Sequence, residues 1–268
     1  MIRDITLGQY YPVKSVLHQM DPRTKLFGTM VFIISLFLAD GLCAYAAGTA
    51  FLVLAIRLSR VPFSFMVRGL KTIFFLLLIS VSFNLFLTDG EVLAQLWFLK
   101  ITREGLRMAF FMALRLIYLV IGSSVMTLTT TPNELTDGLE KGLGFLKAVK
   151  VPVHEISMMM SIALRFIPIL VEETDKIMKA QMARGADFES GNLIQKAKSM
   201  VPLLVPLFIS AFRRATDLAM AMEARCYRGG EGRTKMKPLH YERRDRLAYL
   251  FFALYLAAMA AARIWRLP

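Results

Sequence analysis

Apolar and polar residues are distributed along this chain in long blocks. Five runs consist almost entirely of apolar side chains: residues 26–39, 42–56, 72–87, 105–128 and 247–262. Runs of this kind are typical of transmembrane helices, although the first two, with 14 and 15 residues, fall furthest short of the ~20 residues that one span requires. We therefore predict an all-α membrane protein with about five transmembrane helices, in which flanking residues complete the shorter spans.

A long polar segment separates the fourth apolar run from the fifth. The pattern predicts about four transmembrane helices within residues 1–131, a helical coupling domain in residues 132–246 and a C-terminal transmembrane helix in residues 247–268. The loop at residues 57–71 and the 132–246 segment are rich in Lys and Arg, which is typical of cytosolic segments. We therefore expect both of them to lie in the cytosol.

Two long helices are predicted inside the 132–246 segment. Apolar residues recur at three- and four-residue steps from about residue 155 to residue 184, and again from about 192 to 227. Such regular apolar seams predict that the two helices cross and pack against each other. Pro202 lies inside the second pattern, where it either bends one helix or separates two shorter ones.

Both long helices end in the same short signature. An Arg in the last turn of a helix and a Gly after it are ordinary C-terminal capping signals. A guanidinium flanked by small residues is also suited to enter a partner's groove and to pair with carboxylates there. The repetition favours docking over capping, so we predict docking sites at Ala183, Arg184, Gly185, Ala224, Arg225 and Cys226.

The composition supports a membrane location and narrows the choice of partners. Of the 268 residues, 56% are hydrophobic and 20% are charged, against an apolar content of ~45–50% in soluble domains. The net charge is +13, but the basic residues are spread over loops and helix faces without a nucleic-acid-binding motif. We attribute the charge to the positive-inside bias and to attraction by anionic lipid. The expected partner is therefore the lipid bilayer and not nucleic acid.

The sequence carries no recognisable catalytic or metal-binding pattern. It has no Gly-rich loop ending in Gly-Lys-Ser/Thr, and His18, His154 and His240 do not have the spacing of metal ligands. His154 is expected at a helix start or on the surface. Cys43 and Cys226 lie far apart in unlike surroundings, which argues against a disulfide. We predict no catalytic, cofactor or metal site, and a protein that is not an enzyme.

Arg115 lies well inside the fourth apolar run. A charge within the membrane is costly, and by default it marks a functional residue. The alternatives are that Arg115 faces a polar seam of the helix bundle, or that it extends along a tilted helix toward the interface. The sequence leaves these roles open.

The N-terminal segment and the two helix ends are similar to those of one transporter family. The similarity lies in Leu17–Leu26, in Leu164–Pro168 with the tip Ala183–Asp187, and in Val201–Pro206 with the tip Ala224–Gly230. On these motifs, and over essentially its whole length, the chain resembles the transmembrane T component (the EcfT family) of energy-coupling factor transporters, a branch of the ABC importers. Cys226 departs slightly from the family pattern, which often has Gly or another small residue there.

The resemblance implies a function and a set of partners. It implies two cytosolic ABC ATPase subunits, which bind the ATP and each receive one Arg-bearing tip. It also implies a small membrane substrate-binding (S) component that captures vitamins or other micronutrients. The chain is then the multi-pass coupling subunit, in a prokaryotic plasma membrane, that transmits ATP-driven motion to the S component. The alternatives are a T component dedicated to cobalt or nickel uptake, a membrane-embedded enzyme that uses Arg115, and a scaffold without transport.

Overall fold

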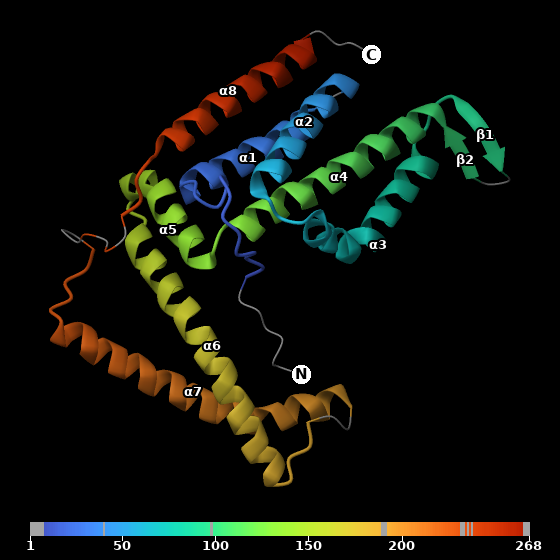
Figure 1. The fold of residues 1–268 in the computed structure, drawn as a ribbon. Coiled ribbons are helices and arrows are strands. Elements are labelled where there is room, and N and C mark those ends of the chain that lie inside the picture. Colours follow the sequence, from blue (N-terminus) through green and yellow to red (C-terminus); the bar gives the residue numbers. More distant parts are fainter. Residues whose placement is uncertain are drawn as a thin grey trace. The chain divides into compact units, whose positions relative to one another are not determined.

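Helices dominate the computed structural model, which describes residues 8–39, 41–96, 99–188, 192–230, 234, 236 and 238–264. The predicted all-α membrane fold is confirmed, with one addition: a short antiparallel hairpin joins α3 to α4, where the sequence indicated only a connection. The elements, drawn in Figure 1, are α1 (Pro22–Leu38), α2 (Leu42–Ser59), α3 (Phe63–Leu87), β1 (Val92–Leu96), β2 (Leu99–Thr102), α4 (Arg103–Thr129), α5 (Pro132–Gly142), the 3-10 helix η1 (Gly144–Val149), α6 (Val153–Ala183), α7 (Leu193–Ala224) and α8 (Arg243–Ile264).

The chain forms two compact units. The helix bundle consists of Gly8–Gly138 and Leu239–Pro268, and the crossed-helix unit is built from Leu139–Pro238. In the helix bundle, α1 packs against α2, α4 and α8, while α3 packs along α4. Three large side chains near the centre of this packing are fully buried: Phe32, Leu36 and Met66. The helix bundle therefore has a continuous apolar core of its own.

The membrane-spanning helices differ in part from the predicted set. Among the described residues, four helices are long and apolar enough to cross a membrane, namely α2, α4, α6 and α8, and α3 is a fifth if its two halves count as one span. The halves of α3 meet at a bend of 62°, and the first half, Phe63–Lys71, occupies what the sequence indicated as a loop. The predicted first span, α1, has 17 residues and is shorter than the others. In contrast, α6, which we placed in the cytosol, has the length and composition of a span.

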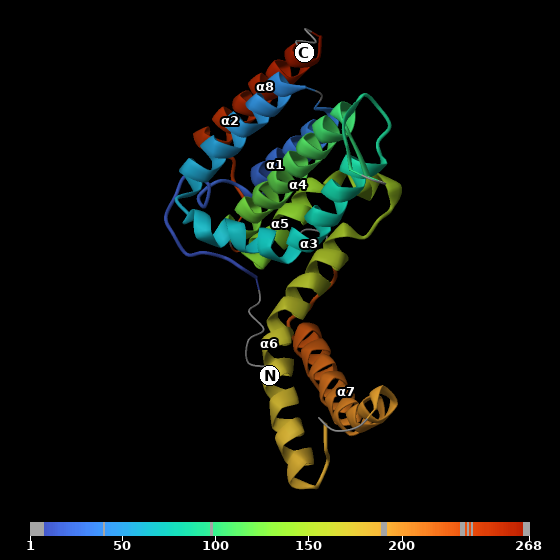
Figure 2. The same ribbon diagram turned by 90° about the vertical axis from the view of Figure 1, so that its right-hand side faces the viewer.

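The crossed-helix unit takes its form from α6 and α7. Figure 1 shows the two helices crossing, as the apolar seams predicted, and in the turned view of Figure 2 α7 lies beside α6. At the crossing, the Glu173 carboxylate accepts hydrogen bonds from Ser210 Oγ at 2.5 Å and from Arg214 Nη2 at 2.8 Å. Pro202 does not divide the second element: α7 is one helix that contains both Pro202 and Pro206. A charge-assisted pair therefore fixes the point at which the helices meet.

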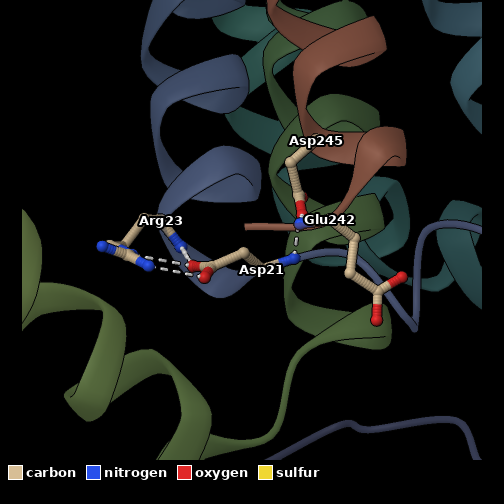
Figure 3. Close-up of polar contacts among 4 residues, drawn as sticks. All are labelled: Asp21, Arg23, Glu242 and Asp245. Atoms are coloured by element: carbon tan, nitrogen blue, oxygen red, sulfur yellow. Dashed lines mark hydrogen bonds and ion pairs between the residues drawn. The ribbon is translucent and has the colours of Figure 1, made fainter. Parts of the chain in front are cut away.

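A buried carboxylate joins the first turns of α1 and α8 within the helix bundle (Figure 3). Asp245 is 1% exposed, and its two oxygens accept backbone N–H bonds from Asp21 at 3.0 Å and from Glu242 at 2.9 Å. Asp21 in turn accepts hydrogen bonds from the backbone and the guanidinium of Arg23. Because Asp21 is the N-cap of α1 and Glu242 directly precedes α8, one side chain caps two helix starts. We call this arrangement the Asp245 clamp.

The segment before α1 packs against the helix bundle through His18. The His18 imidazole contacts Ser15 Oγ at 2.7 Å and the carbonyl oxygen of Tyr11 at 2.9 Å. The backbone N–H of Tyr11 donates to Leu128 O, at the end of α4. Burial lowers the pKa of His18 below its ordinary value of 6.5, so the folded state favours the neutral imidazole.

Candidate docking tips of the crossed helices

The C-terminal end of α6 forms a tight turn at Arg184. Arg184 is the C-cap with φ −91°, and Gly185 follows it in the left-handed region with φ 87°. The N–H of Gly185 donates to Met182 O, and the N–H of Ala186 donates to Gln181 O, both at 3.0 Å. This pair of bonds is the Schellman motif, which satisfies carbonyl groups that a helix end otherwise leaves free.

The C-terminal end of α7 repeats this geometry residue for residue. Arg225 is the C-cap with φ −93°, and Cys226 takes the left-handed place of the glycine with φ 55°. The N–H of Cys226 donates to Glu223 O at 2.8 Å, and the N–H of Tyr227 donates to Met222 O at 3.0 Å. The sequence likeness of the two tips therefore reflects the same backbone conformation, in which Arg occupies the same position.

Both candidate arginines project from the surface of the crossed-helix unit. Arg184 and Arg225 are exposed, as are the flanking alanines, Gly185 and Cys226. The small neighbours leave each guanidinium accessible from several sides, which an interface arginine requires. The six predicted residues thus form two separate sites, one at the end of each helix, rather than one combined site.

The two tips lie the same number of residues from the ion pair between Glu173 and Arg214. At about 1.5 Å per helical residue, Ala183 lies roughly 15 Å beyond Glu173, and Ala224 lies roughly 15 Å beyond Arg214. Glu173 and Arg214 are the ion pair that fixes the crossing. We call the ten-residue segments from this ion pair to each tip the two arms. The helices also touch nearer the α6 tip, where Gln181 Nε2 donates to the carbonyl oxygen of Pro202 at 3.4 Å.

A second polar cluster, which the sequence did not reveal, lies behind the α7 tip. His154 Nδ1 is 2.9 Å from Glu140 Oε1, and Ser157 Oγ donates to Glu140 Oε2 at 3.1 Å. A Cβ atom on Gly230 would overlap the His154 imidazole, so this position needs glycine. His154 is at a helix start, as expected, but it is half-buried rather than a surface residue. The segment that follows Arg225 is thus seated against the start of α6.

One face of α7 is apolar and uncovered in the crossed-helix unit. The predicted seam is only partly packed, because Met200 and Leu204 are exposed and Leu207 and Leu218 are half-buried. Apolar side chains of this size and number form a patch that monomeric soluble proteins rarely expose. We call this surface the α7 apolar face, and it consists of six exposed side chains: Met200, Val201, Leu204, Val205, Phe208 and Phe212.

Arg115 lies midway along α4 and faces α1 inside the helix bundle. Its Nη2 donates to the carbonyl oxygen of Ala39, the C-cap of α1, at 3.4 Å, and its guanidinium lies 5.9 Å from the Phe37 ring. Nε has no hydrogen-bond partner among the described residues. A cation at the C-terminal end of a helix is favourable, so Arg115 offsets the free carbonyls of α1. This contact agrees with the alternative that Arg115 faces a polar seam.

Among the residues that the structure describes, no cluster of three or more potential metal ligands is found. The described features are apolar helices, two exposed arginine tips and an uncovered apolar face. Together they define a multi-pass membrane protein whose distinctive surfaces are suited to binding other subunits.

Comparison with known proteins identifies the family. A family model described as "Cobalt transport protein" (CbiQ) matches residues 13–236. The chain is 55% identical over 267 residues to "Energy-coupling factor transporter transmembrane protein EcfT" of Clostridium kluyveri, covering 99% of both chains. The protein of the same name from Bacillus subtilis is 49% identical over 246 residues, with 91% of this chain and 93% of that protein covered. The chain belongs to the EcfT family of transporter membrane components, which confirms the resemblance found in its sequence.

Proposed function

We propose that this chain couples two cytosolic ABC ATPases to a small membrane subunit that captures the substrate. Arg184 and Arg225 each dock into one ATPase, while the chain itself binds no ATP and carries out no reaction. The observation that carries the proposal is the matched pair of tips: two exposed arginines in the same capping geometry, each at the end of an arm of ten residues that begins at the Glu173–Arg214 ion pair. Duplicate sites are what a pair of similar motor subunits requires.

The crossing gives the proposed motion a mechanical basis. When ATP draws the two ATPases together, each moves the tip that it holds, and the two arms turn about the Glu173–Arg214 contact. This ion pair can stay formed as the axis of the rotation while the apolar contacts around it slide. When the two ATPases approach each other, the angle between α6 and α7 therefore changes.

The α7 apolar face is the surface on which we place the substrate-capture subunit. Large exposed apolar patches mark sites of contact with proteins or membranes. The apolar character of α6, which is sufficient for a membrane span, fits the same assignment. A change in the angle of α6 against α7 then tilts the captured subunit, and the cargo is a vitamin or another micronutrient.

Charge reversal at each tip tests the docking sites. We expect Arg184→Glu and Arg225→Glu each to weaken co-purification of the ATPases by at least about 100-fold, because a reversed charge replaces an interface ion pair. ATP-dependent uptake in reconstituted vesicles should be lost as well. Arg165→Glu on α6 and Arg213→Glu on α7 are matched controls, since both are exposed but lie away from the tips. Normal assembly and uptake in both tip variants would contradict the proposal.

A dedicated cobalt or nickel transporter is the second candidate. The description of the matched family model, "Cobalt transport protein", favours it, whereas the names of the similar whole-length proteins specify no cargo. The chain purified from its own membranes distinguishes the two. Several different capture subunits in the preparation support a shared vitamin module, and a single subunit with cobalt or nickel uptake supports the dedicated one.

A further inference from the structure

An apolar cavity of about 350 Å³ lies within the helix bundle, apart from the docking tips and the α7 apolar face. Four helices contribute to it: α1, α2, α4 and α8, together with the segment that precedes α1. Aromatic rings form much of its wall, from Phe32, Phe51, Phe251 and Phe252. The packing of the bundle therefore leaves a space that its own side chains do not fill.

The chemistry of the wall indicates what this space holds. Apolar cavities of about 150 Å³ already stay free of water and bind small hydrocarbons, and this cavity is more than twice that size. A flexible hydrocarbon chain fits both the size and the apolar wall.

The cavity opens at the surface along one end of the helix bundle. Its lining comes from the first two thirds of α1, the second half of α2, the last turns of α4 and the first half of α8. In an up-and-down arrangement of spans these segments lie at the same membrane face. Several apolar lining residues are exposed there: Val16, Leu54, Leu58, Leu247 and Phe251. A lipid of that leaflet can therefore enter from the side.

Two cations lie at this opening. Among the described lining residues, Lys25 and Arg244 carry charge, and both are positive. Lys25 is only 8% exposed, and its Nζ donates to the carbonyl oxygens of Thr129 at 2.8 Å and His18 at 3.4 Å, which are neutral acceptors. Arg244 is half exposed, lies 3.6 Å from Glu242 and donates a hydrogen bond to the side-chain oxygen of Gln19. Arg243 and Arg246 are also exposed in the first turn of α8, so the excess of charge at the rim is positive.

We infer that this cavity binds one acyl chain of an anionic phospholipid, whose headgroup phosphate pairs with Arg244 at the rim. The apolar wall excludes water from the chain, and the basic rim selects an anionic headgroup over a zwitterionic one. This assignment depends on the helix bundle alone. A result that disproves ATPase docking or changes the identity of the cargo would therefore leave this lipid assignment unaffected.

The test uses the full-length chain in nanodiscs made from equal amounts of phosphatidylglycerol and phosphatidylcholine. After gentle release into detergent, native mass spectrometry counts the lipids that stay bound. We expect the wild type to retain one phosphatidylglycerol in preference to phosphatidylcholine. Equal retention of the two lipids, or retention of neither, would overturn the inference.

Two pairs of variants separate the acyl chain from the headgroup. Ala55→Phe fills the cavity and should reduce retained lipid by at least about tenfold, which the exclusion of only two methylene groups already produces. Ala50→Phe, on the exposed side of the same helix, should retain lipid as the wild type does. Arg244→Gln should keep lipid binding but lose the preference for phosphatidylglycerol, whereas Arg263→Gln, which changes an exposed arginine at the other end of α8, should keep both.

The two pairs of variants also keep the test decisive if one variant does not fold. Size-exclusion and circular dichroism profiles identify a misfolded Ala55→Phe protein, and in that case the headgroup preference of Arg244→Gln decides. If the wild type and Arg244→Gln discriminate equally between the two lipids, Arg244 does not hold the headgroup, and the inference is wrong.

Discussion

The Asp245 clamp should make a large contribution to the stability of the helix bundle. Asp245→Ala removes the acceptor for two backbone N–H groups, those of Asp21 and Glu242, at a position that is 1% exposed. A hydrogen bond to a charged group contributes about 1.5–3 kcal/mol, and water reaches the exposed Glu242 side in the variant. We therefore expect a loss of about 3 kcal/mol in the free energy of unfolding.

The loss can be measured as a melting temperature of the purified chain in detergent. For a chain of this size, about 3 kcal/mol corresponds to a decrease of roughly 6–12 °C. Asp245→Asn should give an intermediate decrease, because the amide oxygen still accepts one N–H while the amide NH₂ opposes the other. Glu242→Ala is the matched control, since its side chain is 59% exposed, and it should change the melting temperature by no more than about 1 °C.

Either of two results would refute this reasoning. If Asp245→Ala melts within about 2 °C of the wild type, the clamp does not hold α1 and α8 together. If Glu242→Ala lowers the melting temperature as much as Asp245→Ala does, the effect comes from charge near the start of α8 and not from the two backbone bonds.

Three further predictions concern single residues. Cys226 has φ 55°, so Cys226→Gly should stabilise the crossed-helix unit by about 1 kcal/mol, measured by denaturant unfolding, and Gly185→Cys should destabilise it by a similar amount. Folding lowers the pKa of His18, so the free energy of unfolding should be highest above pH 6.5 and should decrease as the pH falls through the lowered pKa of the folded state. His18→Gln should flatten this pH dependence, measured as melting curves at several pH values. In a Cys43→Ala chain, a membrane-impermeant maleimide should label Cys226 in inside-out vesicles but not in right-side-out cells, and labelling from outside would contradict a cytosolic tip.

The parts of this fold that depend on local sequence were predictable. Apolar periodicity located α6 and α7 to within three residues at each end, from predicted limits of about 155–184 and 192–227 to Val153–Ala183 and Leu193–Ala224. The paired tips were also found, because a Schellman turn depends on the few residues that form it. Seams of apolar residues indicated that the helices cross, since each seam needs a partner surface.

The features that were missed depend on contacts between distant residues or on helix geometry. The residues next to His154 in the sequence do not indicate its contacts with Glu140 and Gly230, because only the tertiary fold brings these three residues together. The 62° bend of α3 has no proline at the break to mark it. We placed α6 in the cytosol because charged residues in its second half outweighed its apolar first half, although the whole helix has the length and composition of a span. The capping role of Asp245 could have been predicted, because a carboxylate three residues after the N-cap position, here Glu242, is a capping signal.

The Asp245 clamp also determines when the helix bundle can be completed during synthesis. The chain leaves the bundle after Gly138 and returns at Leu239, so the ribosome makes the whole crossed-helix unit while α1 still lacks α8. During that interval the backbone N–H of Asp21 has no carboxylate to bind, and the α1 surface that α8 later covers remains open. A nascent chain that stops before Arg243 would therefore keep this apolar surface of α1 uncovered, and exposed surface of that kind makes incompletely folded chains prone to aggregate.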